Sequence, residues 1–170
     1  MTTGRLHLEL RTKDGATIAV RRGRNSVMKG GAALLADLFR GDGVPINRMG
    51  VGVSDAPETD AFGTLTLTNP TDANDATRLK GDTEVAIPSD AFIVKADETH
   101  RLVQVHVHAT LPDDAAVGTV REAGLLARKD EETATLYNRV VFAPITKGDD
   151  HELTLFWEIS FPYGDLQWMH

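Results

Sequence analysis

The sequence predicts a mainly β protein, an antiparallel β-sandwich that carries one α-helix in its N-terminal half. About eight segments alternate apolar and polar residues with the period of two expected of a half-buried strand. A single segment, near residues 27–39, places its apolar residues at helical spacing. Strands and helices do not alternate along the chain, which argues against a doubly wound parallel sheet. The 170 residues, without an internal repeat or a linker, predict one domain over 1–170.

The first thirty residues predict a β-hairpin. Leu6, Leu8 and Leu10 alternate with polar residues, as in a strand with one buried face. Asp14-Gly15 follows, and this dipeptide is favoured in tight hairpin turns. Residues 17–20 then continue as a second strand, which ends in a basic run made of Arg21, Arg22 and Arg24.

The predicted helix begins after Asn25 or Ser26, either of which could cap it by accepting a bond from a free N–H of the first turn. Gly41 and Gly43 follow it, as a left-handed C-terminal cap requires. Two glycines, 30 and 31, each weaken the helix by about 1 kcal/mol relative to alanine. Close packing against a sheet, or a flexible start to the helix, explains them. Its apolar face consists of Val27, Leu34, Leu35, Leu38 and Phe39.

Downstream of the helix the chain is predicted to be strands and loops. Residues 46–53 form a strand, and residues 54–77 form a polar loop whose length is typical of a binding surface, an arm or a mobile segment. In residues 102–111 the valines face one way, while Gln104, His106 and His108 face the other. The remaining strands are expected at 85–87, 92–95, 124–128, 135–144 and 152–161.

Composition limits the function. Hydrophobic residues make up 41% and charged residues 25%, as in an ordinary globular protein. The chain contains no cysteine, so thiol catalysis and cysteine-ligated metal sites are excluded. Its net charge of −7 argues against a nucleic-acid partner. No segment approaches the roughly 18 apolar residues of a membrane span, so we expect no membrane partner either.

Signals of catalysis are few. The four serines stand outside any Gly-x-Ser-x-Gly elbow, and no glycine-rich phosphate loop is present. We therefore predict no catalytic residues, no cofactor and a protein that is not an enzyme.

His106 and His108 are the candidates for a metal site, because side chains at i and i+2 of a strand lie about 7 Å apart on one face and can share an ion. The sequence does not identify the further ligands that such a site needs. A polar strand face turned to solvent or to a neighbouring subunit explains the pair better, and we predict no metal. Asp72, Asn74 and Asp75 could hold a hard cation, but a solvated loop explains them better.

Two segments are predicted to form interfaces. The basic run of Arg21, Arg22 and Arg24 is either a solvated strand end or a patch for an acidic partner subunit. The tail over residues 162–170 is apolar, and it either folds back on its own domain or docks on another copy. Its large apolar side chains are Leu166, Trp168 and Met169.

Several segments, read together, resemble small structural proteins of tailed bacteriophages and of related contractile tail-like particles. The first is Asn25-Ser26-Val, followed by the Gly- and Leu-rich helix and by Ile46-Asn-Arg-Met-Gly-Val-Gly. The others are Arg121-Glu-Ala-Gly-Leu-Leu, Leu136-Tyr-Asn-Arg-Val-Val-Phe-Ala-Pro-Ile-Thr-Lys and Leu153-Thr-Leu-Phe-Trp-Glu-Ile. The resemblance covers residues 24–53 and 119–161. The loop at 54–77 and the strand with the two histidines match nothing in the group.

The resemblance implies a non-enzymatic structural subunit of a virion, made in the host cytoplasm, that belongs to the tail, the baseplate, a fibre attachment or the capsid decoration. Its implied partners are other copies of itself and other virion or tail proteins, in a symmetric oligomer. The alternative is a carbohydrate or cell-surface binding module of a receptor-binding fibre. Aromatic residues make up only 6% of the chain, which disfavours a site that stacks sugars.

Overall fold

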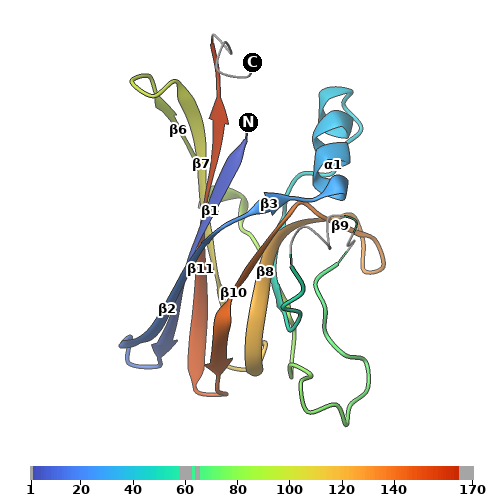
Figure 1. The fold of residues 1–170 in the computed structure, drawn as a ribbon, viewed down its shortest axis with the longest axis vertical. Helices are drawn as coiled ribbons and strands as arrows, with labels where there is room; N and C mark the ends of the chain where they lie inside the picture. Colours follow the sequence, from blue (N-terminus) through green and yellow to red (C-terminus); the bar gives the residue numbers. More distant parts are fainter. Residues whose placement is uncertain (1, 58–62, 64–65, 165–170) are drawn as a thin grey trace.

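Two antiparallel sheets face one another, with one helix at one end, in a computed structural model that describes residues 2–57, 63 and 66–164 (Figure 1). This arrangement confirms the predicted β-sandwich with a helix in the N-terminal half. Within the described part of the chain no helix is both long and apolar enough to cross a membrane.

The first sheet has the strand order β2-β1-β11-β7-β6. The hairpin of β1 and β2 forms as predicted, and Gly15 in its turn has a φ of 88°. The long central strand β11 pairs with β1 on one side and with β7 on the other. The strands are β1 (Thr3–Thr12), β2 (Thr17–Arg24), β6 (Phe92–Asp97), β7 (Leu102–Leu111) and β11 (His151–Pro162).

The second sheet has the strand order β3-β10-β8-β4-β5, and β9 pairs with β8 beside this path. The strand predicted at 135–144 is interrupted at Tyr137, whose N–H bonds to the Leu125 carbonyl 2.9 Å away. The elements are β3 (Ser26–Val27), β4 (Arg48–Gly52), β5 (Glu84–Ala86), the short helix η2 (Ser89–Ala91), β8 (Gly118–Arg128), β9 (Ala134–Leu136) and β10 (Asn138–Lys147).

The core lies between the sheets and follows the predicted alternation. Leu6, Leu8 and Leu10 are buried on one face of β1, and Leu155 and Trp157 are buried on the same side of the neighbouring strand β11. Burying each such side chain stabilises the fold by about 1.5–3 kcal/mol. The opposite faces of these two strands are mainly polar, apart from Phe156, and are partly buried, with Thr154 and Ser160 buried.

The helix α1 (Lys29–Phe39) starts later than predicted. Its N-cap is Met28, whose side chain makes no capping bond, so the predicted cap at Asn25 or Ser26 is wrong. Ser26 belongs instead to β3, which pairs with β10. The helical spacing predicts Phe39 on the buried face, but Phe39 is 95% exposed, because the helix ends there and the chain turns at Gly41, which has the left-handed φ of 77°.

Close packing explains the second glycine of α1. A Cβ on Gly31 would collide with the carbonyl group of Tyr137, whereas a Cβ on Gly30 would lie 3.1 Å from the Thr135 methyl. Both glycines lie in the first turn of the helix rather than in its middle. Gly31 thus allows the helix to begin directly against the second sheet.

The polar loop after β4 is anchored to the outer face of the second sheet. Val53 donates its N–H to the Thr68 carbonyl 2.9 Å away, and the Asn69 side chain bonds to the backbone of Leu79. Gly52 stands where a Cβ would collide with Glu122 and with the Thr68 backbone. The loop is therefore anchored around Val53, Thr68 and Asn69, whereas residues 71–78 are all exposed.

Candidate functional site

His106 and His108 lie on the outer face of β7, as the alternation predicts. Their rings contact different side chains and do not converge on a common point. The His108 ring stacks on Phe156 with 5.7 Å between the ring centroids. The His106 Nε2 lies 3.4 Å from the Gln104 side-chain oxygen. The residues that the structure describes contain no group of three or more side chains able to hold a metal ion.

The acidic residues of the polar loop bond to their own backbone. Asp72 accepts the N–H of Asn74 at 2.9 Å, and Asp75 accepts the N–H and the hydroxyl of Thr77 at 2.8 and 2.7 Å. The bonds from Thr77 lower the pKa of Asp75 below its ordinary value. These carboxylates stabilise turns, and their geometry is that of a solvated loop.

The three arginines of the basic run do not form one patch. Arg22 and Arg24 lie on the outer face of β2, while Arg21 lies on the side of its buried partner Leu8. The Arg21 guanidinium reaches across to β10 and donates to two backbone carbonyls, each 2.8 Å away, which belong to Ala143 and Pro144. Arg21 therefore ties the two sheets together at their edge.

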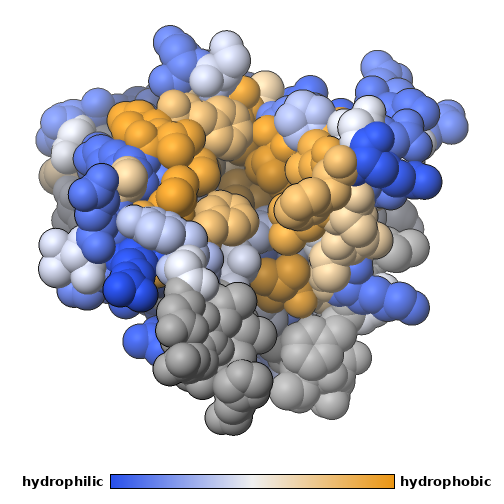
Figure 2. Space-filling view, turned by 90° about the horizontal axis from the view of Figure 1, so that it is seen from above, coloured by the Kyte–Doolittle hydropathy of each residue, from blue (hydrophilic) through white to orange (hydrophobic). Residues whose placement is uncertain are grey.

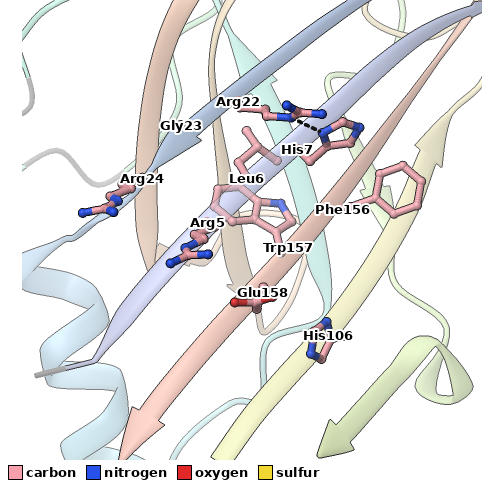
Figure 3. A pocket seen from close by; sticks show the side chains of 10 residues that line it. All are labelled: Arg5, Leu6, His7, Arg22, Gly23, Arg24, His106, Phe156, Trp157 and Glu158. Atoms are coloured by element: carbon pink, nitrogen blue, oxygen red, sulfur yellow. Dashed lines mark hydrogen bonds between the residues drawn. The ribbon is translucent and has the colours of Figure 1, made fainter. Parts of the chain in front are cut away.

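A groove crosses the outer face of the first sheet beside Arg22 and Arg24, with a volume of about 470 Å³ (Figure 3). Its floor is the backbone of one cross-strand row, and the side chains of the two flanking rows form its walls. One wall is Arg22, His7 and Phe156; the other is Arg24, Arg5, Glu158 and His106.

Arg5 and Arg24 are direct cross-strand partners on this face. Like charges in such a pair repel, which destabilises the sheet. Among the described residues neither arginine, nor Arg22, makes an ion pair within 4.0 Å. The arginine end of the groove thus has an excess of positive charge, three arginines beside the single carboxylate of Glu158, on a chain whose net charge is −7.

His7 belongs to a fixed chain of hydrogen bonds. Arg22 Nε donates to its Nδ1 at 3.0 Å, so the ring proton lies on Nε2, which is 2.8 Å from a Glu9 oxygen. Hydrogen bonds from His7 and then from Arg11 lower the pKa of Glu9. Because Glu9 is already satisfied by these two residues, it does not neutralise the arginines of the groove.

An apolar cleft of about 550 Å³ opens at the helical end of the sandwich. Figure 2 looks onto this end and shows apolar side chains gathered around a hollow. Leu34, Leu35 and Leu38 of α1 face the inner side of the first sheet across it. The cleft is also lined by Ile46, Ile87, Phe92, Val94, Val105, Tyr137, Ile159 and Phe161.

The rim of the cleft leaves apolar surface in water. Leu38 is 40% exposed and Val94 is 67% exposed, and Phe39, the last residue of α1, is 95% exposed. Tyr137 lines the cleft from the second sheet, and its buried hydroxyl has no hydrogen-bond partner within the described residues. Burial raises the pKa of this hydroxyl, because the charged form is poorly solvated there.

The other predicted interface, Leu166, Trp168 and Met169, lies outside the described residues. Arg5 and Phe156, both members of the groove, carry no signal in the sequence that marks them as neighbours. The alternation of β1 places Arg5 on the polar face, but only the pairing of β1 with β2 and β11 shows which residues are its neighbours.

Comparison with known proteins found no matching family model, no matching curated protein and no matching solved structure.

Proposed function

We propose that this protein is a non-enzymatic structural subunit of a bacteriophage virion or a phage-like particle. It stands in the tail, the baseplate or a fibre attachment and assembles as a symmetric oligomer. The resemblance of residues 24–53 and 119–161 to such proteins supplies the biological context. Many of the segments that carry this resemblance build the scaffold: Glu122, Asn138 and Arg139, for example, are all buried.

The observation that carries the proposal is the open apolar cleft together with its exposed rim. Soluble monomers seldom leave a large contiguous apolar surface in water, and such surfaces mark contacts with other molecules. Leu38, Phe39 and Val94 belong to this one end of the sandwich. A neighbouring subunit that covers them would gain about 25 cal/mol for each Å² of apolar area removed from water.

The test is the solution mass of the purified chain by light scattering over a hundredfold range of concentration. We expect a discrete multiple of 18.5 kDa. The variant Val94→Glu places a charge on the rim without touching the core and should lower that mass. Ile18→Glu, at a site that is 50% exposed on the β1–β2 hairpin, is the matched control.

A wild-type chain that stays monomeric at every concentration argues against self-assembly. Equal losses of mass in Val94→Glu and Ile18→Glu would instead show that the contact lies elsewhere on the surface.

The second candidate is a carbohydrate or cell-surface binding module of a receptor-binding fibre. Phe156 favours it, since this partly buried ring stands in the wall of the groove opposite Glu158 and beside His7. A flat ring beside hydrogen-bonding side chains suits a sugar that carries a carboxylate. Binding of acidic oligosaccharides by the wild type, lost in Phe156→Ala, would favour this function over assembly.

A further inference from the structure

We propose that the arginine end of the groove binds the acidic β10–β11 turn of a second copy, so that the subunits join head to tail. This inference rests on the proposed self-assembly and names the partner of a second surface. It explains why three arginines gather beside only one groove-lining carboxylate, that of Glu158, on a chain that is acidic as a whole.

The two surfaces lie far apart on one subunit. Asp149 and Asp150 form the turn before β11, which starts at His151 at the end of the sandwich remote from α1 (Figure 1). The groove crosses β11 at Trp157, six residues further along the strand. At about 3.3 Å per residue the two surfaces are roughly 20 Å apart, so a contact between them joins two molecules.

The end of the sandwich that carries the β10–β11 turn, here called the acidic end, has several carboxylates without a close basic partner among the described residues. Asp113 is held by Lys13, with 3.0 Å between the carboxylate and Nζ, and this ion pair lowers the pKa of Asp113. Asp114, Asp149 and Asp150 are exposed, and the only ion pair that they make within the described residues is a 3.6 Å contact from Asp150 to the His151 ring. This end therefore complements the arginine end of the groove in charge.

The turn is also preorganised for docking. Gly148 donates its N–H to His151 Nδ1 at 2.9 Å, and the His151 N–H bonds back to the Gly148 carbonyl at 3.4 Å. These bonds hold the two aspartates at a narrow tip, which reduces the entropy lost on binding. Arginine and carboxylate groups form strong paired hydrogen bonds, and Arg5, Arg22 and Arg24 supply the donors.

The other charged groups of the groove restrict where the tip docks. Glu158 lies in register between Arg5 and His106, and a carboxylate placed beside it would be repelled. The acidic tip thus occupies the end of the groove formed by β1 and β2. A contact between two different surfaces of identical subunits is heterologous, and it closes into a ring or extends into a filament.

A charge-swap experiment tests the contact. Variant one is Arg5→Glu with Arg24→Glu; variant two is Asp149→Arg with Asp150→Arg. We expect each alone to lose the high-mass species of the wild type in light scattering, and their equimolar mixture to regain a species containing both chains. Lys80→Glu with Lys129→Glu changes the net charge as much as variant one at exposed sites and should keep the wild-type mass.

The charge variants separate the head-to-tail contact from self-assembly as such. If the wild type assembles and both charge variants assemble as well, the head-to-tail contact is wrong while self-assembly stands. If the variants are folded monomers and the mixture stays monomeric, the arginines serve another partner and the contact is again overturned. A monomeric wild type overturns both proposals. Thermal melting of each variant shows that it is folded before its mass is interpreted.

Discussion

Glu122 and Arg139 form an ion pair that is almost wholly buried, with 2.5 Å between Glu122 Oε2 and Arg139 Nε and side-chain exposures of 1% and 2%. The other Glu122 oxygen accepts the Thr68 N–H at 2.7 Å, and the Arg139 guanidinium donates to the Ala56 and Ser54 carbonyls. The pair thus joins the start of the polar loop and its residue Thr68 to the second sheet. It explains why that sheet carries two charged residues under a loop.

Breaking this pair should destabilise the fold and release the loop. Glu122→Ala leaves the Arg139 charge buried and unpaired, which costs about 3–5 kcal/mol in the free energy of unfolding. Urea unfolding measures the loss, and limited proteolysis should show faster cleavage near residues 54–57 and 66–69. Arg40→Ala, which removes an exposed ion pair to Asp37, is the control and should change little. An equally small effect of both variants would contradict the anchoring role.

The two glycines of α1 should respond differently to alanine. Gly31→Ala forces a Cβ into the Tyr137 carbonyl and should lower the free energy of unfolding by about 1–3 kcal/mol. Gly30→Ala places its Cβ 3.1 Å from the Thr135 methyl group and at ordinary contact distance, 3.4 Å, from the Leu136 carbonyl oxygen, and it gains helix propensity, so its stability should stay near that of the wild type. Urea unfolding of the matched pair checks this, and equal stability of the two variants would argue against close packing.

Tyr137→Phe should stabilise the protein by about 1 kcal/mol, because it removes a buried hydroxyl that no described residue satisfies. Tyr163→Phe, at an exposed tyrosine, is the control. Since the raised pKa of Tyr137 favours the neutral hydroxyl in the folded state, the wild type should also lose stability above the unfolded value of about 10. The phenylalanine variant lacks this loss. A destabilised Tyr137→Phe would reveal a partner for the hydroxyl.

Lys147 should make stability rise with pH. It is buried, its Nζ bonds to the Asp113 carbonyl at 3.1 Å, and burial lowers its pKa despite the nearby acids. Between the lowered pKa of the folded state and the unfolded value of about 10.4 the unfolded chain therefore binds more protons, so this group adds stability as the pH rises through that window. Urea unfolding of the wild type and Lys147→Met at several pH values isolates the effect. The exposed Lys80→Met is the control, and a difference independent of pH would contradict the prediction.

Removing residues 165–170 should lower the order of the oligomer without unfolding the domain, because three large apolar side chains are lost from the tail. Light scattering measures the mass, and circular dichroism follows the fold. If the shortened chain keeps the native mass, these residues pack on their own subunit.

Alternation in the sequence predicts most of the longer strands and their buried faces, and Gly41 predicts the end of the helix. The alternation around Leu6, Leu8 and Leu10 predicts the inner face of β1, and the same alternation places His106 and His108 together on the outer face of β7. It also separates Arg21 from Arg22 and Arg24, although the three were grouped by their nearness in sequence. The period of two is a property of the strand itself, so it can be recognised in the sequence without knowledge of the fold.

Only the tertiary structure decided which distant residues meet. Glu122 pairs with Arg139, and Arg5 faces both Arg24 and Glu158, because strand order and register bring these positions together. The apolar cleft exists because α1 stands across from the inner face of the first sheet. Such contacts depend on pairings between segments up to about 150 residues apart, as between β1 and β11, and no local pattern encodes them.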